Sequence, residues 1–442
     1  MRLQDLAAIL DLPCPLDLPL SRVSIDSRQV KPGDLFIAIR GEHQDGHQYI
    51  ADAVKNGAAA VLLSEKNLAI DVPQLLVPDT IKALGAIATA HRQTLTSDVI
   101  AITGSNGKTT TKEMVAAILP KQSYATKGNF NNHIGVPLCV LELEPSHRFA
   151  VLELGASHQG EIAYTVAIAK PRVSVITNIA PAHIEGFGSI EGVATAKGEI
   201  YQGLPSHGIA VINDDDHYAH FWDSLLIGKR VVRFSMLKST EIHAKDIIFN
   251  KEGFGQFKLV APSGEQVISL QVAGSHNISN ALAAAACTYA LGMSLPDIAA
   301  GLAAFSGVKG RMTFLKGKND SLVIDDTYNA NLKSSLTALD VLAKRQGRRI
   351  FVFGDMAELG VFSDEHHQAV GETARKLGID LLMTCGEKSE NTSKAYGREG
   401  RHYQSQTDLL QDLVRFLDKT TTVLVKGSRS SAMEKIVQEL RA

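Results

Sequence analysis

The chain has 442 residues, more than a single hydrophobic core usually serves, so roughly two to four domains are expected. Hydrophobic residues make up 45% and charged residues 21%, which is ordinary for a globular protein with a sizeable core. The 45 Lys and Arg residues against 47 Asp and Glu residues give a net charge of -2. This balance excludes a broad basic surface for nucleic acid or anionic membrane, so a polyanion would have to be held at a local site.

The sequence gives no sign of export or membrane insertion. Met1–Leu6 has no basic start followed by a long apolar run, so no signal peptide is expected. No stretch approaches about 18 consecutive apolar residues, so no membrane span is expected. The four cysteines are widely spaced and form no C-x-x-C pair: Cys14, Cys139, Cys287 and Cys385. Reduced thiols in a cytoplasmic protein are the expectation.

Short apolar runs of strand type alternate with helical patterns almost from end to end. The first series is Val23–Ile25, Leu35–Ile39, Ala59–Leu63 and Gln74–Val77. The second is Val99–Thr103, Ala150–Leu154, Val173–Asn178 and Gly208–Ile212. The third is Leu322–Asp325, Arg349–Phe353, Asp380–Thr384 and Thr422–Val425. This alternation predicts α/β units with mostly parallel sheets.

One region breaks the alternation. Within Glu241–Gly274, turn-forming residues separate alternating segments, which predicts antiparallel hairpins. The Ala-rich segment Asn277–Leu291 predicts a buried helix that ends at Gly292. We therefore expect three α/β domains, with ranges 1–97, 98–308 and 309–442. The central one would carry a mostly parallel P-loop ATPase-type sheet with the added hairpins, and the last would be Rossmann-like.

A glycine-rich segment lies between the strand-like Ile100–Thr103 and the helix-like Lys112–Leu119. Its residues are Gly104, Ser105, Asn106, Gly107, Lys108, Thr109 and Thr110. Glycines let the backbone fold around an anion, and successive N–H groups at a helix N-terminus attract phosphate. Lys108 can reach the β- and γ-phosphates of ATP, and the Thr109 hydroxyl can ligate Mg²⁺. The strict pattern G-x-x-x-x-G-K-[ST] fails because Ile102 replaces its first glycine, so a glycine-rich strand–helix turn without nucleotide is the alternative.

Further motifs follow in a specific order along the chain. Thr103–Thr109 resembles the variant phosphate loop of the Mur ligases and of folylpolyglutamate synthetases. The other motifs are Asn129–Leu138, Leu152–Gly155, Asn178–Gly188, Ala196–Ile200, His276–Ala281 and Asp325–Asn331. Together they resemble the dipeptide-adding branch of the Mur ligase family, and the matches run from Asp26 to Arg429, essentially the whole chain.

The resemblance implies an ATP-dependent amide ligase. A substrate carboxylate would attack the γ-phosphate of ATP to give an acyl phosphate and ADP, and an amine would then displace phosphate. Such a site must neutralise charge and fix an in-line geometry. The implied cofactors are ATP and two Mg²⁺ ions. The implied substrates are UDP-N-acetylmuramoyl-tripeptide and D-alanyl-D-alanine, which would give the pentapeptide precursor of peptidoglycan. A monomer that binds no nucleic acid is expected.

The resemblance implies three metal ligands beside Thr109: Glu153, His183 and a modified Lys197. Glu153 ends a predicted strand, where a carboxylate can hold Mg²⁺. His183 lies in the loop after the next strand and would ligate the second ion. From the residues alone, a solvated Glu and a surface His are the alternatives.

Lys197 is implied as a carbamylated lysine. An unmodified ammonium group beside Mg²⁺ would be repelled, whereas reaction with CO₂ turns it into an anion. The reaction requires a neutral amine, hence a pKa lowered by burial or by nearby positive charge. An ordinary lysine on a helix surface is the alternative.

Three residues are implied as further contacts to ATP. Asn280 would contact the nucleotide, although an asparagine that satisfies backbone donors at a helix start is the alternative. Arg311, just past the predicted linker, would reach phosphate from the last domain, although a linker arginine is usually solvated. Asp325 would hold the ribose, with simple strand-end solvation as the alternative. Together these contacts predict closure of the last domain over ATP.

The remaining candidates concern the UDP-linked tripeptide and the dipeptide. Ser27 and Arg28 would bind uracil or the diphosphate, although Asp26–Arg28 also reads as a polar turn. Asn131 and Asn132 would orient the peptide with neutral amides, although asparagine-rich turns are common.

The dipeptide site is implied in the last domain, where its residues would be Tyr328, Asn329 and Asn331. Leu332 and Lys333 depart from the family pattern, which commonly has Pro and an acidic residue there. Three alternative functions remain open: a ligase that adds the third amino acid, a folylpolyglutamate synthetase, and a nucleotide-gated binding module. A module of that kind would need no amine-binding domain.

Overall fold

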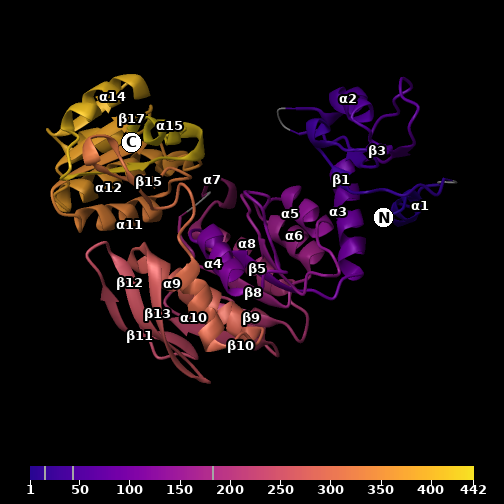
Figure 1. Cartoon of the computed structure of the whole chain (residues 1–442), viewed down its shortest axis with the longest axis horizontal. Coiled ribbons are helices and arrows are strands. Elements are labelled where there is room, and N and C mark those ends of the chain that lie inside the picture. Colours follow the sequence, from indigo (N-terminus) through magenta and orange to yellow (C-terminus); the bar gives the residue numbers. More distant parts are fainter. Residues whose placement is uncertain (14–15, 42–43, 182–183) are drawn as a thin grey trace.

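The computed structural model describes residues 1–13, 16–41, 44–181 and 184–442. The chain forms three α/β domains, and the first and last lie on opposite sides of the central one (Figure 1). Across the described ranges, no helix has the length and apolar character that a membrane span requires.

The first domain holds a four-stranded parallel sheet in the order β1-β2-β3-β4. Its strands are β1 (Val23–Ser24), β2 (Leu35–Ile37), β3 (Ala60–Leu63) and β4 (Gln74–Leu76). Its helices are α1 (Leu3–Ile9), α2 (Ile50–Lys55) and α3 (Thr80–Gln93). All four predicted strands are confirmed to within two residues at either end.

Helix α3 ties the first domain to the central one. The Asp79 carboxylate caps its start by accepting the N–H groups of Ile81 and Lys82. Near its end, the buried Arg92 guanidinium donates hydrogen bonds of 2.9–3.3 Å to the carbonyl oxygens of Leu95, Ser97, Ala169 and Lys170. The bonds to Ala169 and Lys170 join residues 77 and 78 positions apart, so Arg92 fixes the domain junction.

The central domain holds a nine-stranded sheet in the order β13-β12-β11-β10-β9-β8-β5-β7-β6. The strands are β5 (Asp98–Thr103), β6 (Tyr124–Ala125), β7 (Phe149–Glu153), β8 (Val173–Ile176), β9 (Ile209–Asn213), β10 (Arg230–Ser235), β11 (Ile242–Phe249), β12 (Phe254–Ala261) and β13 (Gly264–Ala273). Strands β5 to β11 pair in parallel with one another in this sheet, and β12 pairs antiparallel with both β11 and β13. Both the parallel sheet and the added hairpins are as predicted.

Helices cover both faces of this sheet. They are α4 (Lys108–Ile118), α5 (Gly135–Leu141), α6 (Glu161–Ala169), α7 (Ile184–Phe187), α8 (Ile190–Gln202), α9 (Ser275–Ala290) and α10 (Leu295–Ala304). On β5, Ile100 and Ile102 enter the core beneath α4, α9 and α10, whereas Val99 and Ala101 enter the core beneath α5, α6 and α8. The central strands are apolar throughout because both of their faces are buried.

The third domain holds a six-stranded sheet in the order β14-β15-β19-β16-β17-β18. Its strands are β14 (Thr313–Lys316), β15 (Leu322–Asp326), β16 (Arg348–Gly354), β17 (Leu381–Cys385), β18 (Gly400–Tyr403) and β19 (Thr421–Lys426). Its helices are α11 (Leu332–Ala343), α12 (Ser363–Lys376), α13 (Glu390–Tyr396), α14 (Gln406–Leu413) and α15 (Glu434–Leu440). The sheet is parallel except for the edge strand β14, which the sequence pattern did not predict.

Candidate functional site

The glycine-rich loop joins the end of β5 to the start of α4, and α4 begins at Lys108, four residues earlier than predicted. Gly104 and Gly107 have φ values of +148° and +81°. A Cβ atom on Gly104 would lie 1.9 Å from Thr177 Oγ1, and one on Gly107 would lie 2.3 Å from Asn280 Oδ1. Both positions therefore require glycine, which leaves the backbone free to curve around an anion.

The end of β8 holds the loop in shape. The Ser105 N–H donates to the Asn178 carbonyl at 2.9 Å, and the Asn106 N–H donates to Asn178 Oδ1 at 3.2 Å. The Thr177 hydroxyl donates to the Asn106 carbonyl at 2.6 Å. Three hydrogen bonds thus hold the backbone of the loop to the end of β8.

Lys108 folds back over the loop. Its ammonium donates to the Gly104 carbonyl at 2.7 Å. Burial lowers the pKa of Lys108, the charge of Arg311 lowers this pKa further, and Glu153 opposes both effects. A phosphate group would supply the anionic partner that favours the charged form.

Thr109 and Glu153 place two oxygen donors side by side. The Thr109 hydroxyl donates to Glu153 Oε2 at 2.8 Å, and Asn131 Nδ2 donates to Glu153 Oε1 at 2.8 Å. Carboxylate and hydroxyl oxygens suit Mg²⁺, which usually takes few protein ligands and completes its shell with water and phosphate. No cluster of three or more His, Cys, Asp or Glu that could hold a metal occurs among the described residues. The donor set therefore fits Mg²⁺ bound together with a nucleotide.

Lys197 lies in α8, almost fully buried, and its ammonium is 5.7 Å from the centre of the Phe187 ring. Burial lowers the pKa of Lys197 well below its usual range, and the charge of Lys108 lowers it further. The amine is therefore disposed to be neutral. His183, the other expected metal ligand, lies outside the described residues.

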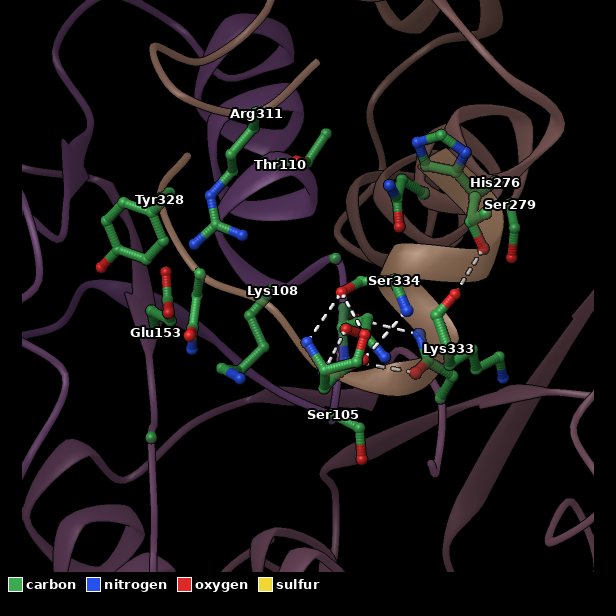
Figure 2. Close-up of a pocket in the computed structure, with 18 of the residues that line it drawn as sticks. Ser105, Lys108, Thr110, Glu153, His276, Ser279, Arg311, Tyr328, Lys333 and Ser334 are labelled. Atoms are coloured by element: carbon green, nitrogen blue, oxygen red, sulfur yellow. Dashed lines mark hydrogen bonds between the residues drawn. The ribbon is translucent and has the colours of Figure 1, made fainter. Parts of the chain in front are cut away.

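Arg311 reaches the loop from the start of the third domain (Figure 2). Its Nη2 donates to the Thr109 hydroxyl at 2.9 Å, and its guanidinium carbon lies 4.1 Å from the centre of the Tyr328 ring. A planar guanidinium at this point suits a phosphate group.

Asn331 makes a second contact between the third domain and the loop. Its Nδ2 donates to Asn106 Oδ1 at 2.8 Å. Its Oδ1 accepts the Ser334 N–H at 2.9 Å, and the Ser334 hydroxyl stands 3.1 Å from the Asn331 N–H in a capping box. Helix α11 therefore starts normally at Leu332, although this residue departs from the family pattern.

These groups surround a cavity of about 960 Å³ between the central and third domains. The expected site residues that line it are Ser105, Asn106, Gly107, Lys108, Thr110, Asn131, Asn132, Glu153, Asn280, Arg311, Tyr328, Asn329 and Asn331. Asn280 lies in the second turn of α9, whose N-cap is Gly274, so its reading as a helix cap is excluded.

The other expected site residues that the structure describes do not line the cavity; they are Gly104, Thr109, Lys197, Ser27, Arg28 and Asp325. Ser27 is buried and Arg28 exposed in the first domain, where Arg28 pairs with Asp26 at 2.8 Å. Asp325 turns back to accept the Thr327 N–H and hydroxyl, and does not line the cavity. The neighbouring Asp326 does line it.

Two further residues, which were not among the expected site residues, line the cavity from other elements. Lys426, at the end of β19, donates to Asp326 Oδ2 at 2.6 Å and to the Asn329 carbonyl at 2.9 Å. His276, in the first turn of α9, lines the cavity, and its Nδ1 is buried without a hydrogen-bond partner among the described residues. Burial, and then the charge of Lys426, lower the pKa of His276 to about 4. Two features of the sequence could have indicated these residues: His276 begins the motif His276–Ala281, and Lys426 follows a predicted strand.

A pinned glycine loop, a lysine, a threonine and a strand-end carboxylate at one edge of a parallel sheet define a P-loop nucleotide-binding protein. Three family models match the chain: the Mur ligase family catalytic domain over residues 19–92, the Mur ligase middle domain over 102–288, and the Mur ligase glutamate ligase domain over 310–429. The chain belongs to the Mur ligase family.

Similar proteins match over nearly their whole length. The UDP-N-acetylmuramoyl-tripeptide--D-alanyl-D-alanine ligase of Escherichia coli is 44% identical over 430 residues, which cover 96% of this chain and 94% of the relative. A crystal structure of MurF from Acinetobacter baumannii matches with a TM-score of 0.92 and 35% identity, covering 99% of this chain and 98% of the other. MurF ligase from Thermotoga maritima in complex with ADP matches with a TM-score of 0.85 and 28% identity, covering 96% and 98%.

Proposed function

We propose that this chain joins D-alanyl-D-alanine to UDP-N-acetylmuramoyl-tripeptide at the expense of ATP, which gives the pentapeptide precursor of peptidoglycan. The Escherichia coli relative named for this reaction is 44% identical to this chain over 430 residues. The observation that carries the proposal is the meeting of two domains at one cavity. Arg311 of the third domain contacts Thr109 of the phosphate loop at 2.9 Å, so an amine bound by the third domain would face a phosphorylated carboxylate.

The reaction requires two displacements. A carboxylate oxygen of the tripeptide attacks the γ-phosphorus of ATP, the bond to the bridging oxygen breaks, and ADP leaves. The amine of the dipeptide then attacks the acyl phosphate carbon, the carbon–oxygen bond to phosphate breaks, and the amine gives up a proton. Bringing two anions together is the difficult step, so cations and fixed geometry provide the catalysis.

The proposed roles follow from the contacts around the loop. Lys108 and Arg311 neutralise phosphate charge, since both lie at the loop and line the cavity. Thr109 and Glu153 would hold one Mg²⁺, which would screen the phosphate charge. Asn280 would contact the nucleotide from its place beside Gly107 at the cavity. For the ribose we propose Asp326 in place of Asp325, because only Asp326 lines the cavity.

A second Mg²⁺ is proposed at His183 and a carbamylated Lys197. The lysine amine would attack CO₂, form a nitrogen–carbon bond and release one proton, which leaves a carboxylate. The burial of Lys197 and its lowered pKa support this step, because the neutral amine is the reacting form.

The peptide substrates are assigned to the outer domains. We propose that Ser27 and Arg28 of the first domain bind the uridine diphosphate, and that Asn131 and Asn132 orient the peptide. Asn329 and Tyr328 lie at the third-domain wall where the dipeptide would enter. We retain domain ranges of 1–97, 98–308 and 309–442, a monomer as the working unit, and the cytoplasm as its location.

An isotope-transfer experiment tests this mechanism. The tripeptide is prepared with ¹⁸O in its terminal carboxylate, and the phosphate released with ATP, Mg²⁺ and D-alanyl-D-alanine is analysed by mass spectrometry. Attack by the carboxylate predicts that one ¹⁸O moves into each released phosphate. Phosphate without the label would exclude the acyl phosphate route.

A further inference from the structure

Arg311 contacts the phosphate loop through a long, rotatable side chain. Its Nη2 donates to Thr109 Oγ1, whereas its buried Nε has no hydrogen-bond partner within the described part of the chain. One hydrogen bond at the tip does not fix the plane of a guanidinium, and ordering such a side chain costs rotamer entropy. Another group must hold it.

The Tyr328 ring supplies that support. The guanidinium carbon lies 4.1 Å from the ring centre, within the range of a cation–π contact. Figure 2 shows the ring beside the guanidinium, which points toward Lys108 and the loop. The ring therefore lies against the guanidinium whose Nη2 reaches Thr109 of the phosphate loop.

Tyr328 also holds the backbone on which Arg311 sits. Gly310 and Met312, on either side of Arg311, have φ values of +74° and +53°, so the turn is left-handed at both flanks. The Tyr328 N–H donates to the Gly310 carbonyl at 3.0 Å, and the Met312 N–H donates to Asp326 Oδ1 at 3.2 Å. A left-handed non-glycine residue persists only where its surroundings enforce it. The end of β15 and the residues that follow it thus fix both sides of the Arg311 turn.

We propose that Tyr328 is a positioning residue for ATP: its ring and its N–H hold Arg311 at the phosphate loop before nucleotide arrives. This role differs from the dipeptide contact expected from the sequence. The proposal rests on the proposed function only in taking ATP as the nucleotide, because neither peptide substrate takes part in it. Without the ring, the guanidinium would have to be ordered by the nucleotide itself, which would weaken binding.

Calorimetric binding of a non-hydrolysable ATP analogue with Mg²⁺ to the full chain tests the proposal. Tyr328→Leu is expected to weaken binding about 3- to 30-fold, the range of a cation–π contact. Tyr328→Phe keeps the ring and should stay within about twofold of the parent chain. Phe416→Leu is the matched control, because Phe416 also packs under an arginine, Arg401 at 4.9 Å, but does not line the cavity.

The Arg311→Gln background shows whether Tyr328 acts through Arg311. There, Tyr328→Leu should weaken binding by less than about twofold further. Thermal midpoints of all variants are measured to confirm folding, and the KM for D-alanyl-D-alanine is measured in parallel. Unchanged nucleotide binding by folded Tyr328→Leu, or equal losses in the Phe and Leu variants, would overturn the proposal. Nucleotide binding needs no peptide, so failure of amide formation would count against the proposed function alone.

Discussion

Asn331 of the third domain donates its side-chain amide to the Asn106 side chain of the phosphate loop at 2.8 Å. The same side chain caps α11 through its oxygen, and this bond directs its nitrogen toward the loop. The start of α11 is thereby placed directly on the segment that would hold ATP phosphates. Helix placement and nucleotide binding are consequently coupled.

Replacing Asn331 separates its two bonds. Asn331→Ser keeps a helix cap but is too short to reach Asn106, so the thermal midpoint should hold while kcat/KM for ATP falls about 3- to 10-fold. Asn331→Ala should lose both. Ser405→Ala, which removes the cap of α14 in the same domain, should lower only the thermal midpoint. Equal kcat/KM values in the parent chain and Asn331→Ser would show that the contact carries no coupling.

Substitution of Gly107 in the phosphate loop should cause a selective loss of nucleotide binding. Gly107→Ala would place a methyl group 2.3 Å from Asn280 Oδ1, whereas Gly128→Ala, also at positive φ, would meet nothing within 4 Å. Both substitutions should cost about 1–2 kcal/mol of stability from the left-handed backbone. Only Gly107→Ala should abolish calorimetric ATP binding. Comparable ATP affinities in the two variants would contradict the tight packing of the loop.

Carbamylation of Lys197 is directly observable. In buffer with ¹³C-labelled bicarbonate, the parent chain should give one carbamate resonance by ¹³C NMR. Lys197→Ala should lose this resonance, and Lys121→Ala, a change at an exposed lysine, should retain it. A parent chain without the resonance, or a Lys197→Ala variant that keeps it, would exclude the modification.

His276 predicts an acid limit to stability. Its pKa is lowered to about 4 by burial, below the ordinary value of 6.5 in the unfolded chain. The unfolded state therefore binds the proton first, so stability is fully present above pH 6.5 and falls as the pH drops toward 4. The loss should reach up to about 3 kcal/mol in urea unfolding. His276→Asn should flatten this limb, whereas His220→Gln, at an exposed site, should not.

Arg92 predicts a large cost at the junction of the first two domains. Arg92→Met would remove the donor from four carbonyl groups, three of them in buried hydrogen bonds, which should cost about 3 kcal/mol or more. Arg230→Met, at an exposed pair with Glu241, should change stability by less than about 0.5 kcal/mol. The urea midpoints of the two variants provide the comparison, and similar midpoints would show that the junction does not depend on Arg92.

The phosphate loop was predictable from the sequence because residues close together in the chain determine its structure. The phosphate loop needs a strand, two glycines and a helix within about a dozen residues, and all are contiguous. The contact of Arg311 with Thr109 spans 202 positions and depends on how two domains meet, which no local pattern encodes.

The sequence pattern could not show which of Asp325 and Asp326 faces the cavity, for a different reason. Adjacent strand residues point to opposite faces, so an error of one position reverses the direction of the side chain. The edge strand β14 was missed because it is short and half-exposed, with no apolar run to mark it.

The most direct test of the account is product formation by the full chain from ATP, Mg²⁺ and UDP-N-acetylmuramoyl-tripeptide, with D-alanyl-D-alanine, with a single D-alanine, or with neither. The products are identified by mass spectrometry, and phosphate is measured in the same samples. The account predicts UDP-N-acetylmuramoyl-pentapeptide and one phosphate per product with the dipeptide only. Phosphate release that does not depend on the dipeptide, or no amide product with it, would contradict the account.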